Sequence, residues 1–218
     1  MLVLATGNRA KGRELAALLA DLPYRIDDLS AFPGVVVPPE GETSYADNAL
    51  GKARAATRAT GELALADDSG IEVDAFGGRP GVLSARYGGE GLTDLERNAL
   101  MLRELAGVPA ERRTARYRAV IAVTAPDGRE ATVEGMVEGV LLGAPRGAGG
   151  FGYDPIFYYP PLGATFAELS AEAKHAVSHR GRAVALAREV LQRWASRSGE
   201  EATRILLKRL VSGCGAAR

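Results

Sequence analysis

Two adjacent acidic residues, Asp67 and Asp68, follow an apolar run, ELALA, that has the composition of a buried strand. We expect the strand to end at this pair, because Ser69 and Gly70 come next and favour a turn. Neighbouring residues of a strand point to opposite sides, so the two carboxylates are predicted to have different roles. Together with Glu40 of the loop PPEGETSY, they offer the oxygen ligands that suit Mg²⁺ shared with a phosphate chain. An Asx-type turn explains the same acidic pair without any ligand.

The hexapeptide TGNRAK, residues 6–11, follows another apolar run and precedes a helical pattern. A strand-to-helix junction of this kind presents backbone N–H groups and the positive end of a helix, which together suit a phosphate. The spacing is neither the P-loop pattern GxxxxGK[ST] nor the dinucleotide pattern GxGxxG. A plain turn in which Asn8 caps the helix is the competing interpretation.

The stretch GGFGYDPIF, residues 149–157, places glycines beside aromatic residues. Glycines next to Phe151 allow the backbone to approach a flat ligand, and the ring can stack on a base. Asp154 can accept a hydrogen bond from the same ligand. The alternative is a glycine-rich turn in which Phe151 and Tyr153 belong to the core.

The stretch KHAVSHRGRA, residues 174–183, contains both histidines of the chain. His179 and Arg180 diverge on a regular helix but converge at the broken start of one, for which Ser178 is a suitable N-cap. Their N–H donors suit carbonyl oxygens on a base. His175 and His179 have the spacing of a zinc helix, but HAVSH lacks the glutamate of HExxH and a third ligand, so zinc is not predicted.

Periodicity indicates the elements that must position these residues. In the first half, the predicted elements are a strand at 2–6 with a helix after it, a helix from 43 to 61, a strand at 62–66, and a short extended piece and loop from 71. A helix from the capping box Thr93/Glu96 to 107 follows, and then β-rich runs at 114–126 and 129–142. The remainder is predicted as a glycine-rich loop, a mostly helical segment at 166–199 and a further short helix at 201–213. Pro126-Asp127-Gly128 predicts an antiparallel hairpin. The fold class expected is α/β, with a mixed central sheet flanked by helices and two closely joined lobes around a cleft.

The 27 basic and 27 acidic side chains cancel, so no overall field favours nucleic acid or an anionic membrane. We therefore expect a small-molecule partner. Met1 leads directly into LVLATGN, and no apolar run approaches about 18 residues, so we expect a cytoplasmic protein. The single cysteine, Cys214, cannot form an internal disulfide, and we interpret it as an inert thiol.

The chain closely resembles the Ham1-like inosine triphosphate pyrophosphatases, the bacterial XTP/dITP diphosphatases, over roughly residues 2–193. Five motifs carry the resemblance, in this order: TGNRAK, SYADNALGKA, LADDSGIEVDAFGGRPGVLSARYGG, GGFGYDPIF and FAELSAEAKHAVSHRGRA. The resemblance implies hydrolysis of the α–β phosphoanhydride of dITP, ITP and XTP to the monophosphate and pyrophosphate. It also implies a homodimer, a catalytic domain at 1–195 and a C-terminal extension of unknown role at 196–218.

Site residues are implied by the same resemblance. Asp68 is the expected proton acceptor that prepares the attacking water, and Glu40 and Asp68 are the expected Mg²⁺ ligands. Asn48 is a lesser candidate near the phosphates. The expected substrate-binding residues are Thr6, Gly7, Asn8, Arg9, Ala10, Lys11, Ser69, Phe151, Gly152, Tyr153, Asp154, Lys174, His179 and Arg180.

Two other functions were weighed. A Maf-like nucleotide pyrophosphatase has an early serine and a double-arginine loop that are absent from this sequence. A nucleotide-binding sensor without catalysis has no use for Asp68 beside a metal.

Overall fold

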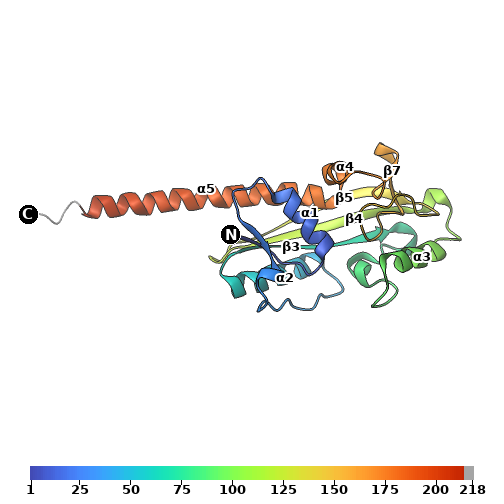
Figure 1. The fold of residues 1–218 in the computed structure, drawn as a ribbon, viewed down its shortest axis with the longest axis horizontal. Coiled ribbons are helices and arrows are strands. Elements are labelled where there is room, and N and C mark those ends of the chain that lie inside the picture. Colours follow the sequence, from blue (N-terminus) through green and yellow to red (C-terminus); the bar gives the residue numbers. More distant parts are fainter. Residues whose placement is uncertain (214–218) are drawn as a thin grey trace, which may run out of the picture.

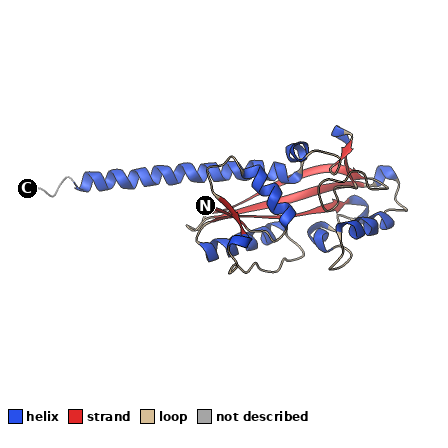
Figure 2. Cartoon of the chain, viewed as in Figure 1, coloured by secondary structure: helices blue, strands red, loops and turns tan. Residues whose placement is uncertain are grey.

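The computed structural model describes the backbone of residues 1–213 and the side chains of residues 1–196. Within this part, one 7-stranded sheet has the order β2-β1-β3-β4-β5-β6-β7, with helices on both of its faces (Figure 1, Figure 2). The strands are β1 (Leu2–Leu4), β2 (Ile26–Asp28), β3 (Leu63–Val73), β4 (Thr114–Thr124), β5 (Glu130–Leu141), β6 (Phe157–Tyr159) and β7 (Ala164–Thr165). The helices are α1 (Arg9–Leu19), α2 (Tyr45–Thr60), α3 (Asp94–Glu104), α4 (Ala171–Val177) and α5 (His179–Gly213). Short 3₁₀ helices span Leu29–Ala31, Asp74–Phe76, Gly81–Arg86, Ala110–Arg112 and Pro160–Leu162.

The sheet is mixed. β1 lies parallel to β2 and β3, whereas the pairs from β3 to β7 are antiparallel. β4 and β5 form the expected hairpin, paired from Thr114↔Val140 to Thr124↔Glu130. This arrangement confirms the predicted α/β class.

The prediction that a strand ends at Asp67 and Asp68 is wrong. β3 continues through both residues to Val73 and pairs with β4 along this whole length. The Asx-type turn is thereby excluded. Charged residues are tolerated in the middle of this strand because each carboxylate meets cationic or amide side chains from a helix that packs on its own side of the sheet.

Two apolar clusters on one face of β3 form the cores of two lobes. Leu65 belongs to an apolar cluster with α1 and α5, and Ile71 belongs to a second cluster with α3 and the segment before β6. Between them on the same face lie Asp67 and Ser69, which interrupt the apolar pattern. The other face of β3 packs against alanines of α2 in a third cluster. The polar interruption leaves room for a cavity between the lobes.

Local capping fixes three helix starts, two of them as predicted and that of α1 as the competing interpretation of TGNRAK has it. The Asn8 side chain accepts hydrogen bonds from two backbone N–H groups of α1, and Ser44 caps α2. Thr93 and Glu96 form a complete capping box at α3. Gly61 ends α2 in the left-handed conformation, with φ of 68°.

α5 is one helix of 35 residues and includes the segment that was predicted as a separate short helix (Figure 1). Ser178, in extended backbone between α4 and α5, accepts a hydrogen bond from the backbone N–H of Gly181, so the predicted cap at a broken helix start is confirmed. In the described part of the chain, no helix is long and apolar enough to cross a membrane. Cys214 lies outside the described residues.

Candidate active site

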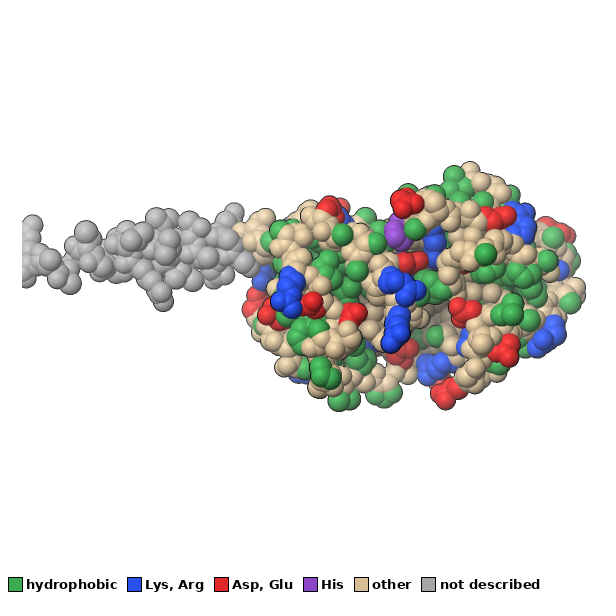
Figure 3. Space-filling model, in the orientation of Figure 1, with side chains coloured by type: hydrophobic (Ala, Val, Ile, Leu, Met, Phe, Trp, Pro, Cys, Tyr) green, Lys and Arg blue, Asp and Glu red, His purple; other side chains and the backbone are tan. Residues whose placement is uncertain are grey.

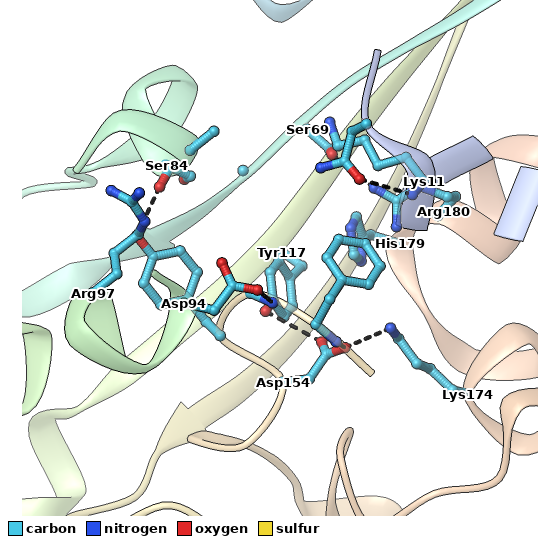
Figure 4. A pocket seen from close by; sticks show the side chains of 16 residues that line it. Lys11, Ser69, Ser84, Asp94, Arg97, Tyr117, Asp154, Lys174, His179 and Arg180 are labelled. Atoms are coloured by element: carbon cyan, nitrogen blue, oxygen red, sulfur yellow. Dashed lines mark hydrogen bonds and ion pairs between the residues drawn. The ribbon is translucent and has the colours of Figure 1, made fainter. Parts of the chain in front are cut away.

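A cavity of about 190 Å³ opens between the two lobes. Figure 3 shows this face hollowed near its middle, with basic side chains gathered beside the hollow, and Figure 4 shows the lining from close by. The cavity is lined by Asn8, Lys11, Ser69, Gly70, Ser84, Ala85, Asp94, Arg97, Tyr117, Phe151, Gly152, Tyr153, Asp154, Lys174, His179 and Arg180. Residues from every motif noted in the sequence except the one at the start of α2 therefore meet in one place.

The edge of β3 facing β1 is open at this cavity. β1 ends opposite Leu65, and Pro80 bridges Glu72 farther along, so no strand pairs with β3 on that side between Asp67 and Ser69. The Nζ of Lys52, on α2, reaches round this open edge and donates to the backbone oxygen of Asp67 at 2.8 Å. Groups on the two faces of β3 can therefore approach a common ligand at this edge, although a sheet normally separates its faces.

Asp67 is fully buried and anchors two cations on one face of β3. Its Oδ1 lies 2.7 Å from Nζ of Lys11, and its Oδ2 lies 3.2 Å from Nε of Arg180. Burial works to raise the pKa of Asp67, but Arg180 and Lys11 outweigh it and hold that pKa well below its usual range. Asp67 therefore stays ionised and holds the two cations at the cavity wall.

Glu14, on α1, joins Arg180 to a third cation. One of its oxygens accepts from Nη1 of Arg180 at 2.7 Å, and the other accepts from Nζ of Lys174 at 2.7 Å. Burial opposes ionisation of Glu14, but the two cations lower its pKa. Helices α1, α4 and α5 are thus tied together around the site by charge-assisted hydrogen bonds.

Asp68 points to the opposite face of β3, toward α2. Its Oδ2 accepts from Nδ2 of Asn48 at 2.9 Å, and its Oδ1 lies 3.6 Å from Nζ of Lys52. The same Nζ lies 2.5 Å from Oε1 of Glu40, so Lys52 stands between two carboxylates. Burial raises the pKa of Asp68 even though Lys52 opposes the shift. Such a carboxylate is suited to accept a proton.

The donor set around Glu40 and Asp68 fits a hard cation. Both groups are oxygen donors, both already face a positive charge, and both lie at the open edge of β3. Among the described residues there is no group of three or more His, Cys, Asp or Glu that could hold a metal ion. A pair of carboxylates suits Mg²⁺, which keeps several waters and takes further ligands from bound phosphates.

The loop before β6 forms the floor of the cavity. Oδ2 of Asp154 accepts from the backbone N–H of Phe151 at 2.9 Å and from Nζ of Lys174 at 2.6 Å. The Phe151 ring lies 4.7 Å from that Nζ and 5.6 Å from the guanidinium of Arg180. Asp94, at the start of α3, also holds the loop, since its Oδ2 accepts from the N–H of Gly152 at 2.6 Å. The aromatic ring at the floor is thus fixed and bordered by cations.

A row of small residues brings the start of α5 down onto the sheet. Ser69, Ala119 and Gly135 are neighbours across β3, β4 and β5. A Cβ atom on Gly135 would lie 2.2 Å from the backbone oxygen of His179, so only glycine permits this approach. It places His179 and Arg180 at the cavity, where both are buried.

His179 and Arg180, the pair predicted at the start of α5, differ in their hydrogen bonding. Arg180 donates to Ser69 Oγ at 2.8 Å as well as to Asp67 and Glu14, so most of its donors are already used. Burial lowers the pKa of His179 well below its usual value, and the nearby Arg180 adds to this effect. The imidazole is therefore neutral.

The structure brings most predicted site residues together, but not all. Thr6, Gly7 and Arg9 line a neighbouring cleft beside β2 rather than the main cavity, and Asn8 lines both. The backbone N–H of Ala10 is occupied by the Asn8 cap, so the capping interpretation of this turn is confirmed. Glu40 and Asp68 lie on the α2 side of β3, away from the cavity lining but close to its open edge.

Several residues of the site were not predicted. Glu14 follows Lys11 by one helical turn and lies on the same side of α1, and Lys52 follows Asn48 by one turn on α2. Lys52 also lies within the motif SYADNALGKA and Ser84 within LADDSGIEVDAFGGRPGVLSARYGG, although the resemblance assigned neither of them a role. Tyr117, Asp94 and Arg97 come from other segments, and no local pattern assigns them to the site.

Comparisons with known proteins point to one family. The model of the Ham1 family matches residues 2–190. The chain is 53% identical to a dITP/XTP pyrophosphatase of Desulforamulus reducens, over 88% of this chain and 96% of that protein. It is 52% identical to a dITP/XTP pyrophosphatase of Geobacter sulfurreducens, over 87% and 96%. A HAM1 protein from Coxiella burnetii has the same fold, with a TM-score of 0.77 and 40% identity over 88% of this chain and 98% of that one. Because the family match covers the whole sheet and every wall of the cavity, the chain belongs to the Ham1 family.

Proposed function

We propose that this protein is a Mg²⁺-dependent nucleoside-triphosphate pyrophosphatase that hydrolyses the non-canonical purine nucleotides dITP, ITP and XTP to the monophosphate and pyrophosphate. One observation carries the proposal: a cavity with an aromatic floor and four cationic side chains opens beside a buried carboxylate with a raised pKa. The names of the two bacterial relatives support the substrate class.

Asp68 acts in this proposal as the proton acceptor. Water adds across the α–β phosphoanhydride, and its proton passes to Asp68 as pyrophosphate leaves. The Asn48 amide holds the Asp68 carboxylate through Oδ2 and leaves Oδ1 for the water. Burial favours the protonated form of Asp68 and so makes its carboxylate a better base.

Glu40 and Asp68 would hold Mg²⁺, which when bound neutralises charge on the triphosphate. Lys52 keeps the two carboxylates together, since its Nζ faces both. Lys11, at the start of α1, faces the opposite side of the open β3 edge and is placed to bind the phosphate chain. Neighbouring Thr6, Gly7, Asn8, Arg9 and Ala10 are proposed to support that chain through the α1 turn.

The purine base binds at the end of the cavity formed by the loop before β6 and the start of α5. Phe151 stacks on the purine, with Gly152, Tyr153 and Asp154 completing the floor, and Lys174 lies at its edge. His179 and Arg180 present N–H donors to the carbonyl at C6 of hypoxanthine or xanthine. Adenine has an amino group there, so a site built for the carbonyl rejects it. Ser69 joins the two ends, since it accepts from Arg180 and lies next to Asp68.

The test is release of pyrophosphate from ITP, dITP, XTP, GTP and ATP in the presence of Mg²⁺. We expect the non-canonical purines to react at least about 100-fold faster than ATP, as expected of a site that pairs with a polar group. Equal rates on ITP and ATP would show that the base-selection part of the proposal is wrong.

Asp68→Asn separates an enzyme from a sensor that only binds nucleotide. We expect the variant to lose turnover by about 100-fold or more, because a general base contributes 10²–10⁴-fold, while it still binds ITP in a direct titration. A variant with full activity would remove Asp68 from the mechanism.

The assembly and location of the protein belong to the same proposal. We propose a cytoplasmic homodimer in which residues 1–195 form the catalytic domain and residues 196–218 form an extension. Neither nucleic acid nor a membrane is expected as a partner. Sedimentation at micromolar concentration tests the dimer, and a single monomeric species would refute it.

A further inference from the structure

Tyr117 on β4 connects the two ends of the base-selection site. Its side chain lies on the face of the sheet that carries the cavity, opposite Ile71 on β3 and Val137 on β5. It is 7% exposed and lines the cavity (Figure 4). Its ring contacts His179 and its hydroxyl contacts Asp154, and the proposed function gives both of these residues a role in binding the purine.

The ring of Tyr117 stacks on the imidazole of His179. The ring centroids are 4.5 Å apart and the planes differ by 9°. Among the side chains that the structure describes, Nδ1 of His179 is buried without a hydrogen-bond partner. No hydrogen bond at Nδ1 fixes the orientation of this neutral ring, so the flat face of Tyr117 is what sets its plane.

The hydroxyl of Tyr117 donates to Oδ1 of Asp154 at 3.3 Å. The other oxygen of Asp154 already accepts from Phe151 and Lys174. At 3.3 Å the hydroxyl contact is longer than either of these, so Asp154 is held mainly through Oδ2. Of the two contacts of Tyr117, the stacking contact is therefore the one whose loss moves a purine-binding group, the His179 imidazole.

We propose that Tyr117 is a positioning residue that sets the discrimination between 6-oxopurine and 6-aminopurine nucleotides through the plane of the His179 imidazole. The proposal rests on the proposed function, because it assumes that His179 faces C6 of the base. A hydrogen bond to a C6 carbonyl weakens steeply as its angle departs from linearity. Tilting the imidazole therefore lowers kcat/KM for ITP more than it lowers kcat/KM for ATP.

The experiment compares Tyr117→Leu with Tyr117→Phe. Leucine removes the flat face, and we expect the ratio of kcat/KM for ITP over ATP to fall about tenfold, the upper end of what one aromatic pair contributes. Phenylalanine keeps the face and lacks only the hydroxyl, and we expect the wild-type ratio to within about twofold. Rescue of discrimination by the aromatic variant distinguishes positioning from general damage.

Val137→Ala is the matched control. Val137 is 1% exposed, pairs with Tyr117 across the hairpin and does not line the cavity. We expect this variant to be less stable than the wild type but to keep the ITP-over-ATP ratio. Should Tyr117→Leu not fold, Tyr117→Met takes its place with the same expected result, because methionine fills an irregular gap without a flat face.

The outcomes are separable. A wild-type protein that does not favour ITP over ATP refutes the proposed function and leaves the stacking geometry unaffected. A wild type that discriminates, with an unchanged ratio in Tyr117→Leu, overturns the role of Tyr117. A loss in Tyr117→Phe as large as that in Tyr117→Leu also overturns it, because the hydroxyl and not the ring would then be responsible.

Discussion

The buried carboxylates around the cavity are paired with cationic side chains and hold them in place. Asp67, Glu14 and Asp154 each accept from two or more groups around the cavity, and their cationic partners come from α1, α4 and α5. A buried carboxylate loses hydration, so its partners must compensate. The site is therefore assembled from ion pairs whose members lie far apart in the sequence.

Glu14→Gln tests this balance through pH. The pKa of Glu14 is lowered below 4.5 in the folded protein, so ionised Glu14 stabilises the fold at pH above about 4.5 and this contribution fades as pH falls through the folded-state value. Glutamine lacks the charge at every pH. We expect urea unfolding at pH 7 to show the variant less stable by about 1–3 kcal/mol, with the difference shrinking only as the pH falls below about 4.5. A difference that is constant with pH would contradict the assignment.

At the scale of elements, local signals gave the helix starts, because a cap depends on neighbouring residues. Ser44 and Thr93 act as the sequence predicts, and Asn8 acts as one of the two interpretations of its turn has it. The course of β3 through Asp67 and Asp68 was not predictable in the same way. Its charges are accommodated by Lys11 and Lys52, which reach them from two different helices, and no window around LADDSG contains that information.

The close approach of α5 to the sheet gives a prediction at Gly135. An added methyl would meet the backbone at His179 and at Ala183, neither of which can rotate away. We expect Gly135→Ala to destabilise the fold by about 1–3 kcal/mol and to lower activity, because it moves His179 and Arg180. Thermal unfolding and pyrophosphate release measure the two effects.

Gly107→Ala is the control for this change. A Cβ atom at Gly107 would meet nothing within 4 Å, so stability and turnover are expected to remain close to those of the wild type. If Gly135→Ala behaves like Gly107→Ala, the sheet does not constrain the start of α5.

At the scale of the whole molecule, the family match ends at residue 190 while α5 continues to Gly213. The buried side chains of the apolar clusters and the lining of the cavity lie before residue 192, and Trp194 packs against the first cluster. Of the extension, the side chain of Ser196 alone is described, and it donates to the backbone oxygen of Gln192 in the same helix.

A chain ending at Ala195 tests the domain boundary. We expect it to fold and to release pyrophosphate from ITP at the wild-type rate, measured beside the full-length chain at equal concentration. Sedimentation of both chains shows whether the extension affects assembly. Loss of the folded state in the shortened chain would move the boundary of the domain beyond residue 195.

The adjacent positions of Asp67 and Asp68 on one strand have an evolutionary consequence. Because their side chains lie on opposite faces of β3, we expect substitutions around the cavity on the α5 face to change base preference, under the proposed function, without repacking the residues that surround Asp68 on the α2 face. Under the same proposal, substrate preference is open to change by substitution while bond cleavage is retained.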